Sequence, residues 1–306
     1  MAGKSPPRAT VAKARKRLPL VVWQKITTWI CQQVQQCSAS MDKWRSHRVV
    51  LVDGTCLTLP NEPELRRDFP PPKGYHGYGK YPPARMVCLS LAKTMAVISY
   101  SIGKYKQDET TLLKPMLKTL QKGDLLVADR HFAGANLFFS YMANGLEYLT
   151  RVHQKLKISR LKRLWSYSAD DFVAGLKIGA LYRRQNPELP KYITARFIRV
   201  TACIRGKRRD IRLVSSLLDA REYPADEMAQ LYLQRWRIET LFKQFKVNTS
   251  AYQLRSKSSD AIHKEIAGWL VPERPGRLEP RRLSHDPKHY PRLRITRAQW
   301  RKQYVA

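Results

Sequence analysis

The order of strand-like and helix-like segments constrains the fold of this chain more than any other feature of its sequence. Segments rich in β-branched and apolar residues are typical of strands, and apolar residues at helical spacing are typical of helices. We predict three strands first, at 49–60, 84–94 and 95–105, followed by a helix at 108–120. A strand at 123–132, a helix at 133–145 and a strand at 146–152 come next. Neighbouring strands followed by strands that alternate with helices predict an α/β fold with a mixed central sheet flanked by helices.

Two further segments complete the predicted architecture. Residues 153–222 lose the helical spacing and contain β-branched runs, which indicate a β-rich insertion. Residues 225–247 contain strong helix formers and no Gly or Pro, so they predict one long helix. We therefore expect a basic helical N-terminal segment at 1–48 and a core in two parts, at 49–152 and 223–270, with the insertion at 153–222 between them. A divergent, weakly ordered basic tail follows at 271–306.

The chain carries a large excess of positive charge. It has 57 Lys and Arg against 24 Asp and Glu, a formal net charge of +33. Basic residues gather within 1–48, 155–163, 204–212 and 274–302. Any one cluster could be a solvated face, but four of them with few acids favour contacts with the phosphates of a long nucleic acid. A non-catalytic RNA-binding protein would carry the same charge, so charge alone does not decide the function.

Several other classes of protein are excluded by the sequence. No run of about 18 residues is apolar throughout, so we expect no transmembrane helix and no membrane partner. The N-terminus lacks the apolar region of a secretory signal, which favours a cytoplasmic protein. The five Cys are far apart and form no CxxC pair, so they predict neither a disulfide framework nor a zinc site.

Three acids stand out in so basic a chain. Asp53 and Asp129 each end an apolar segment predicted to be a strand, and Glu239 lies in the long predicted helix. A buried carboxylate is unfavourable unless it is paired, solvated or bound to a metal. Together the three carboxylates could hold two Mg²⁺ ions, the arrangement that activates a water or a 3′-hydroxyl at a phosphodiester bond.

Each acid also has a simpler, structural interpretation. Asp53 and Asp129 could each accept a hydrogen bond from the turn or helix that follows, and Glu239 could form an ion pair one helical turn away. The partners in reach along the chain are Gly54, Arg130, Arg235 and Lys243. We interpret His131 as a structural neighbour of Asp129 and not as a general base. The functional hypothesis therefore depends on the three acids as a set.

Four polar residues of the long predicted helix fall on one stripe. Tyr232, Arg235, Glu239 and Lys246 are separated by three, four and seven positions, which is the spacing of residues on one helical face. A phenol, a guanidinium, a carboxylate and an ammonium form a poor core stripe. They suit contact with phosphates and a metal, since a guanidinium makes forked contacts and an ammonium acts as a point charge.

These residues also match the motifs of a known family. The stripe fits the pattern Y-x(2)-R-x(3)-E-x(6)-K, and DGT at 53–55 and ADRHF at 128–132 are similar to the first two acid motifs of the same family. From about Arg8 to Trp269, the chain resembles the DDE transposases of bacterial insertion sequences, of the family-four type. The resemblance implies a ribonuclease-H-like sheet flanked by helices, a β-rich insertion, and a divalent metal, Mg²⁺ or Mn²⁺.

The resemblance also implies roles for single residues. Asp53, Asp129 and Glu239 would be the catalytic acids and the metal ligands. The DNA-binding residues would be Tyr232, Arg235 and Lys246. The implied enzyme cleaves DNA at insertion-sequence ends and transfers the cut strand to a target. Its partners would be double-stranded DNA, of the transposon ends and the target, and a second copy of the chain in a homodimer on DNA. Such a protein would act at the nucleoid in the bacterial cytoplasm.

The sequence departs from the family pattern at both ends. The chain begins almost at the catalytic region, where many relatives have a further N-terminal segment. After Leu270, where the family continues as an apolar helix, the sequence has five Pro, ten Lys or Arg and no helical spacing. The alternative hypothesis is therefore an inactive, truncated or frameshifted remnant that only binds DNA.

We expect a protease to remove the tail before it cuts the core. Each Pro lacks a helix donor and clashes with the preceding turn, and the dense charge leaves little to bury. Brief digestion with trypsin followed by mass spectrometry should give a core fragment that ends near residue 270. Survival of the tail for as long as the core would contradict this expectation.

Overall fold

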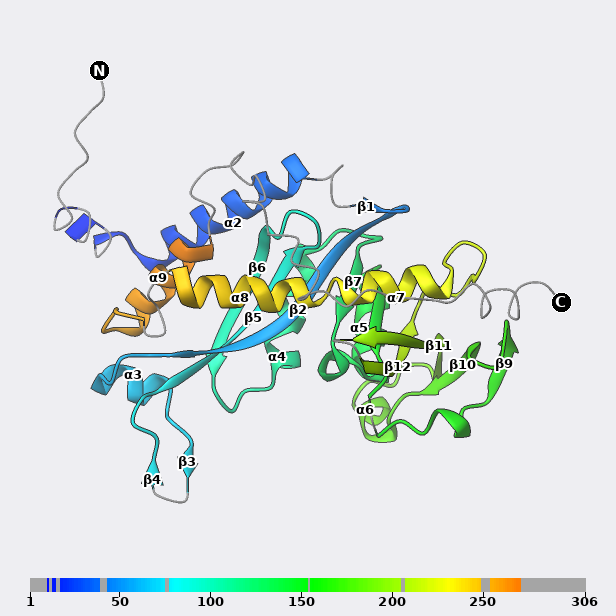
Figure 1. Cartoon of the computed structure of the whole chain (residues 1–306). Coiled ribbons are helices and arrows are strands. Elements are labelled where there is room, and N and C mark those ends of the chain that lie inside the picture. Colours follow the sequence, from blue (N-terminus) through cyan, green and yellow to red (C-terminus); the bar gives the residue numbers. More distant parts are fainter. Residues whose placement is uncertain are drawn as a thin grey trace.

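The computed structural model describes residues 10, 13–14, 17–38, 43–74, 77–153, 155–204, 207–248 and 254–270. The tail predicted at 271–306 therefore lies outside the described residues. A large mixed sheet crosses the molecule, and helices cover both of its faces (Figure 1). Within the described ranges, the structure contains no helix with the length and apolar character needed to cross a membrane.

The strands predicted for the core form one half of this sheet. They are β2 (His47–Thr58), β5 (Pro83–Leu91), β6 (Val97–Lys104), β7 (Leu125–Ala128) and β8 (Glu147–Arg151). Their order in space is β6-β5-β2-β7-β8. The pairs β2–β5 and β5–β6 are antiparallel, whereas β2–β7 and β7–β8 are parallel. The predicted α/β fold with a mixed sheet is thus confirmed.

Helices pack on both faces because the central strand β2 is apolar on both sides. The helices concerned are α3 (Pro63–Asp68), α4 (Glu109–Leu113), α5 (Ala135–Ala143), α7 (Ala225–Leu233), α8 (Trp236–Asn248) and α9 (Ser259–Leu270). Val49 and Leu51 share a core with α3, α7, α8 and α9. Val50 and Val52 share the other core with α4 and α5. A continuous apolar run is typical of a strand covered on both faces.

The predicted β-rich insertion joins the core sheet. Its described residues contain β9 (Arg163–Ser166), β10 (Asp171–Lys177), β11 (Tyr192–Ile204) and β12 (Lys207–Ser215), with the short helices η3 (Ile158–Arg160) and α6 (Ala180–Gln185). β12 pairs antiparallel with β8, where Leu213 lies opposite Arg151. The order then continues through β11 and β10 to β9. These strands extend the core sheet and do not form a separate one, and the domain boundaries drawn from the sequence stay a prediction.

Smaller elements complete the described chain. A short strand, β1 (Lys43–Trp44), pairs with the start of β2. A two-stranded hairpin of β3 (Lys73–Gly74) and β4 (Gly77–Tyr78) extends from the body of the molecule (Figure 1). The predicted helix 108–120 is α4 followed by a 3-10 helix, η1 (Lys114–Thr119). Pro115 accounts for the change, because it has no N–H to continue α-helical hydrogen bonding.

The prediction of one helix over 225–247 is wrong. The segment forms α7 and α8, which follow one another across one face of the sheet (Figure 1). At the junction, the amides of Gln234 and Arg235 donate to carbonyls three residues back, so the backbone tightens into a 3-10-type turn.

A buried ion pair ties the insertion to the start of the α7 segment. Arg196 on β11 is fully buried, and its Nε donates to Asp171 on β10 at 2.7 Å. Its Nη1 donates to the carbonyl of Tyr223 at 2.7 Å, just before α7. A guanidinium in such a place is tolerable because its charge and its donors are satisfied.

We expect Asp171→Ala to destabilise the fold strongly. It leaves the Arg196 guanidinium buried without its counter-charge, which typically costs about 3–5 kcal/mol. Urea unfolding of the full chain measures the loss. The control is Asp210→Ala, which removes an exposed partner of Arg199 and should cost at most about 1 kcal/mol. Equal losses in the two variants would contradict the assignment.

Candidate active site

Asp53 and Asp129 lie at the same edge of the sheet because their strands are parallel neighbours. In the β2–β7 pairing, Val52 lies opposite Ala128. The two acids are the next residues of their strands, at the point where β7 ends. Parallel strands direct their carboxyl ends to one edge, so acids that are distant in sequence are brought together there.

Each of these two acids uses one oxygen to accept a hydrogen bond from the backbone that follows it. Oδ1 of Asp53 accepts one from the amide of Gly54, the next residue of β2, at 2.9 Å. Oδ1 of Asp129 accepts one from the amide of His131 at 2.6 Å, which caps the 3-10 helix η2 (Arg130–Phe132). The structural interpretation is therefore correct for Asp129, whereas no turn follows Asp53, because β2 continues to Thr58. The functional interpretation stays open, because the second oxygen of each carboxylate makes neither of these bonds.

Arg235 joins the sheet to the helix that carries the third acid. Its Nη1 lies 3.2 Å from Oδ2 of Asp53, and its Nη2 lies 2.7 Å from Oε1 of Glu239. The guanidinium is almost fully buried, with 9% of the side chain exposed. The ion pair between Arg235 and Glu239 is the structural interpretation expected for a helical Glu. The same guanidinium also brings Glu239 to the edge that carries Asp53.

The pKa of Asp53 records how close the three acids are. Burial is the main cause that raises this pKa from its ordinary 3.8 to about 6. The positive charge of Arg235 and the amide of Gly54 lower it, whereas the negative charges of Asp129 and Glu239 raise it further. The other two carboxylates therefore both act on Asp53.

The other residues of the predicted stripe are placed differently. Tyr232 is 3% exposed and packs in the core on the α7 side of the helix break. Burial raises the pKa of its phenol to about 12. The phenol still reaches the site, because it shares a side-chain hydrogen bond with Arg235 and the negative charge of Asp129 contributes to its raised pKa. The DNA-binding role of Tyr232 stays a prediction. Lys246 lies in α8, but its side chain is outside the described residues, and its role stays a prediction.

The donor chemistry of this site fits a hard divalent cation. Carboxylate oxygens are the ligands that Mg²⁺ and Mn²⁺ prefer, and Asp53 and Asp129 each keep one oxygen that the backbone hydrogen bond does not use. In the described part of the chain, no group of three His, Cys, Asp or Glu is already arranged to hold a metal. Arg235 is instead the counter-charge that two of the three acids share.

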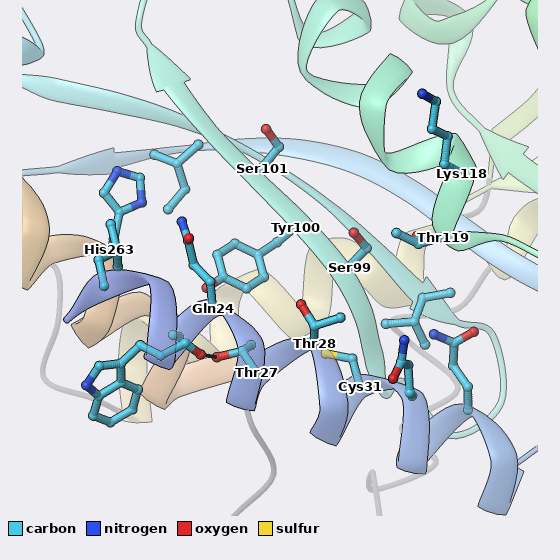
Figure 2. A pocket seen from close by; sticks show the side chains of 17 residues that line it. Gln24, Thr27, Thr28, Cys31, Ser99, Tyr100, Ser101, Lys118, Thr119 and His263 are labelled. Carbon is cyan, nitrogen blue, oxygen red and sulfur yellow. Dashed lines mark hydrogen bonds between the residues drawn. The ribbon is translucent and has the colours of Figure 1, made fainter. Parts of the chain in front are cut away.

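A separate cavity lies beside the edge strand β6. It has a volume of about 520 Å³, and it is lined by residues of α2 (Leu20–Ser38), β6, η1 and α9. Figure 2 shows Tyr100 directed from β6 toward α2. None of the three acids is among its lining residues. Burial raises the pKa of the Cys31 thiol in this wall to about 11, so the thiol stays protonated at neutral pH.

The fold and the site together define a class of protein: a mixed α/β protein whose carboxylates converge at one sheet edge, the donor set used in metal-dependent phosphoryl transfer. Comparison with known families identifies the particular one. The family model described as "Transposase DDE domain" matches residues 44–271. The chain belongs to this family, as its motifs indicated.

Individual relatives agree with this assignment. The chain is 24% identical over 265 residues to the transposase InsG for insertion sequence element IS4 of Escherichia coli (strain K12). The aligned region covers 86% of this chain and 59% of that protein. It is 25% identical over 150 residues to the putative transposase InsZ of the same organism, 45% of this chain and 46% of that protein. The chain thus spans less than two thirds of the length of these relatives. Among solved structures, it is similar to the cryo-EM structure of the piggyBac transposase synaptic complex with hairpin DNA, with a TM-score of 0.39 and 12% identity over 73% of this chain and 46% of that chain.

We expect Asp53→Asn to stabilise the metal-free protein at pH 8. The folded pKa of about 6 lies above the ordinary 3.8, so folding disfavours the ionised form of Asp53. The stability linked to this group is full below pH 4 and is lost as the pH rises through 6. The gain in the free energy of unfolding should be about 1–3 kcal/mol at pH 8 and should vanish at pH 4. Urea unfolding at both pH values measures it, and an equal gain at both would contradict the shift.

Proposed function

We propose that this chain catalyses DNA transposition by phosphoryl transfer: it cleaves DNA at insertion-sequence ends and transfers the cut strand to a target. The observation that carries the proposal is that Asp53 and Glu239 share Arg235 and that Asp129 and Glu239 both act on Asp53, in a chain of the DDE transposase family. The likeness to a relative named as the transposase for insertion sequence element IS4 supports the same activity.

The proposal includes a ribonuclease-H-like core with a β-rich insertion. Three antiparallel strands, β6, β5 and β2, adjoin two parallel strands, β7 and β8, and helices cover both faces. The insertion enters after β8 and returns to α7. This arrangement supports the assignment, because it places Asp53 within β2, Asp129 directly after the neighbouring parallel strand β7, and Glu239 on a helix that packs on the same sheet.

Within this proposal, Asp53, Asp129 and Glu239 hold divalent metal ions, Mg²⁺ or Mn²⁺. When bound, such ions supply an activated nucleophile and neutralise charge that develops on the phosphodiester. The chain itself contributes the orientation of the acids. Hydrogen bonds from the amides of Gly54 and His131 fix Asp53 and Asp129, and the guanidinium of Arg235 limits their mutual repulsion in the free protein.

The proposed ligand is double-stranded DNA, both the element ends and the target. The net charge of +33 favours a polyanion, and the insertion presents exposed cations. These are Lys155, Lys157, Arg160 and Lys162. Arg235 lies beside the acids and is paired with two of them, and its DNA-binding role is proposed from the family resemblance. We also propose a homodimer on DNA, in the bacterial cytoplasm at the nucleoid, as the family resemblance implies.

The test is cleavage of a duplex that carries the inverted repeats flanking the gene. With Mg²⁺ or Mn²⁺, the full chain should cut this duplex. Glu239→Gln should lower the cleavage rate by more than about 100-fold, because a loss of about 10- to 100-fold is typical for residues that only support metal ligands. Glu239→Gln should still bind the duplex in a mobility-shift assay.

The matched control is Glu227→Gln, which changes an exposed acid on α7 that pairs with Arg45 and should leave cleavage intact. A wild-type chain that binds the duplex but never cuts it would contradict the proposal and support the inactive remnant. Failure to bind DNA at all would contradict both.

A further inference from the structure

A fourth carboxylate lies beside the acid site. It belongs to Glu109, the first residue of α4, and its side chain is 16% exposed. A Cβ built on Gly54 would lie 2.5 Å from Cδ of Glu109 and 2.6 and 2.7 Å from its two oxygens. Gly54 directly follows Asp53 in β2. The carboxylate of Glu109 therefore occupies the space that a side chain at position 54 would need.

Two neighbours hold Glu109 in this place. Nη1 of Arg85, on β5, donates to Oε1 of Glu109 at 2.8 Å. Arg85 is itself fixed, because its Nε donates to the carbonyl of Tyr105 at 3.1 Å and its guanidinium lies 5.3 Å from the centre of the Tyr105 ring. On the helix side, Asp108 caps α4 by accepting from the amide of Thr110. The position of the carboxylate is thus set from the sheet and from the helix.

Glu109 also faces the turn that follows the second acid. Its Oε2 lies 3.9 Å from Nε2 of His131. The amide of His131 in turn donates to Oδ1 of Asp129. One carboxylate therefore lies against the residue after Asp53 and faces the residue whose backbone orients Asp129.

We propose that Glu109 is a positioning residue of the acid site. Held by Arg85, its carboxylate lies against Gly54 and faces His131, and it thereby fixes the two strand-end acids relative to each other. The inference rests on the proposed function, because the acids that it positions are those that hold the metal. The backbone at Gly54 is not left-handed, so a larger residue there would conflict with the Glu109 carboxylate and not with the backbone conformation.

The experiment measures Mn²⁺ binding to the full chain without DNA, by isothermal titration calorimetry. Glu109→Ala should weaken Mn²⁺ binding by about 10-fold or more, the loss typical when support for a metal ligand is removed. Glu109→Gln should stay within about threefold of the wild type, because it has the same size and still accepts from Arg85.

Two further variants show whether the effect passes through the Gly54 contact. Gly54→Ala should weaken Mn²⁺ binding like Glu109→Ala, because its methyl group displaces the Glu109 carboxylate. The double variant Gly54→Ala with Glu109→Ala should bind no more weakly than Glu109→Ala alone, since two changes that act through one contact are not additive. Full additivity would overturn the inference.

The controls separate this inference from the proposed function. Glu227→Ala removes a comparable Arg–Glu ion pair, at 2.8 Å, and should leave Mn²⁺ binding unchanged. If Asp53→Ala binds Mn²⁺ as well as the wild type, the proposed metal site fails. If Asp53→Ala weakens binding and Glu109→Ala does not, only the role of Glu109 fails. Circular dichroism shows whether each variant folds. If Glu109→Ala does not fold, the test passes to Gly54→Ala, and unchanged Mn²⁺ binding by that variant would overturn the inference.

Discussion

The buried guanidinium of Arg235 is the interaction on which the acid site depends. Burial is the main cause that raises the pKa of Asp53, and the negative charges of Asp129 and Glu239 raise it further. Arg235 offsets part of this and connects Asp53 of the sheet with Glu239 of α8. The break between α7 and α8 lies at the same residue, where the amide of Arg235 donates to a carbonyl three residues back.

The sequence was sufficient for those parts of the molecule that follow from local pattern. Apolar runs predicted the strands, and the parallel pairing of two of them is enough to bring Asp53 and Asp129 together. The break at 234–235 could not be predicted, because residues 225–247 contain no Gly or Pro to signal it. The pairing of Arg235 with Asp53 depends on a partner that lies far away in the chain. Glu109 was missed for the same reason: an acid in the first turn of a helix is common, and only the fold places it against Gly54. The metal-binding and DNA-binding roles of single residues stay predictions.

The structural and the functional interpretation of the strand-end acids turn out to be compatible. A carboxylate has two oxygens, and Asp53 and Asp129 each use one to accept from the backbone that follows, within β2 for Asp53 and in η2 for Asp129. The capping bond orients the side chain and leaves the other oxygen for a further partner. A residue that looks like a helix cap or a turn former in the sequence can therefore still be a ligand, and the choice between the two roles is not needed.

The continuity of the sheet has a mechanical consequence. β8 is hydrogen-bonded to β7 on one side and to β12 on the other, and Arg196 ties the insertion strands to the segment that leads into α7. The insertion is thus attached at two points, one leading to the strand that precedes Asp129 and the other to the segment before the helices that carry Glu239. The insertion and the elements that carry the acids are therefore parts of one continuous framework.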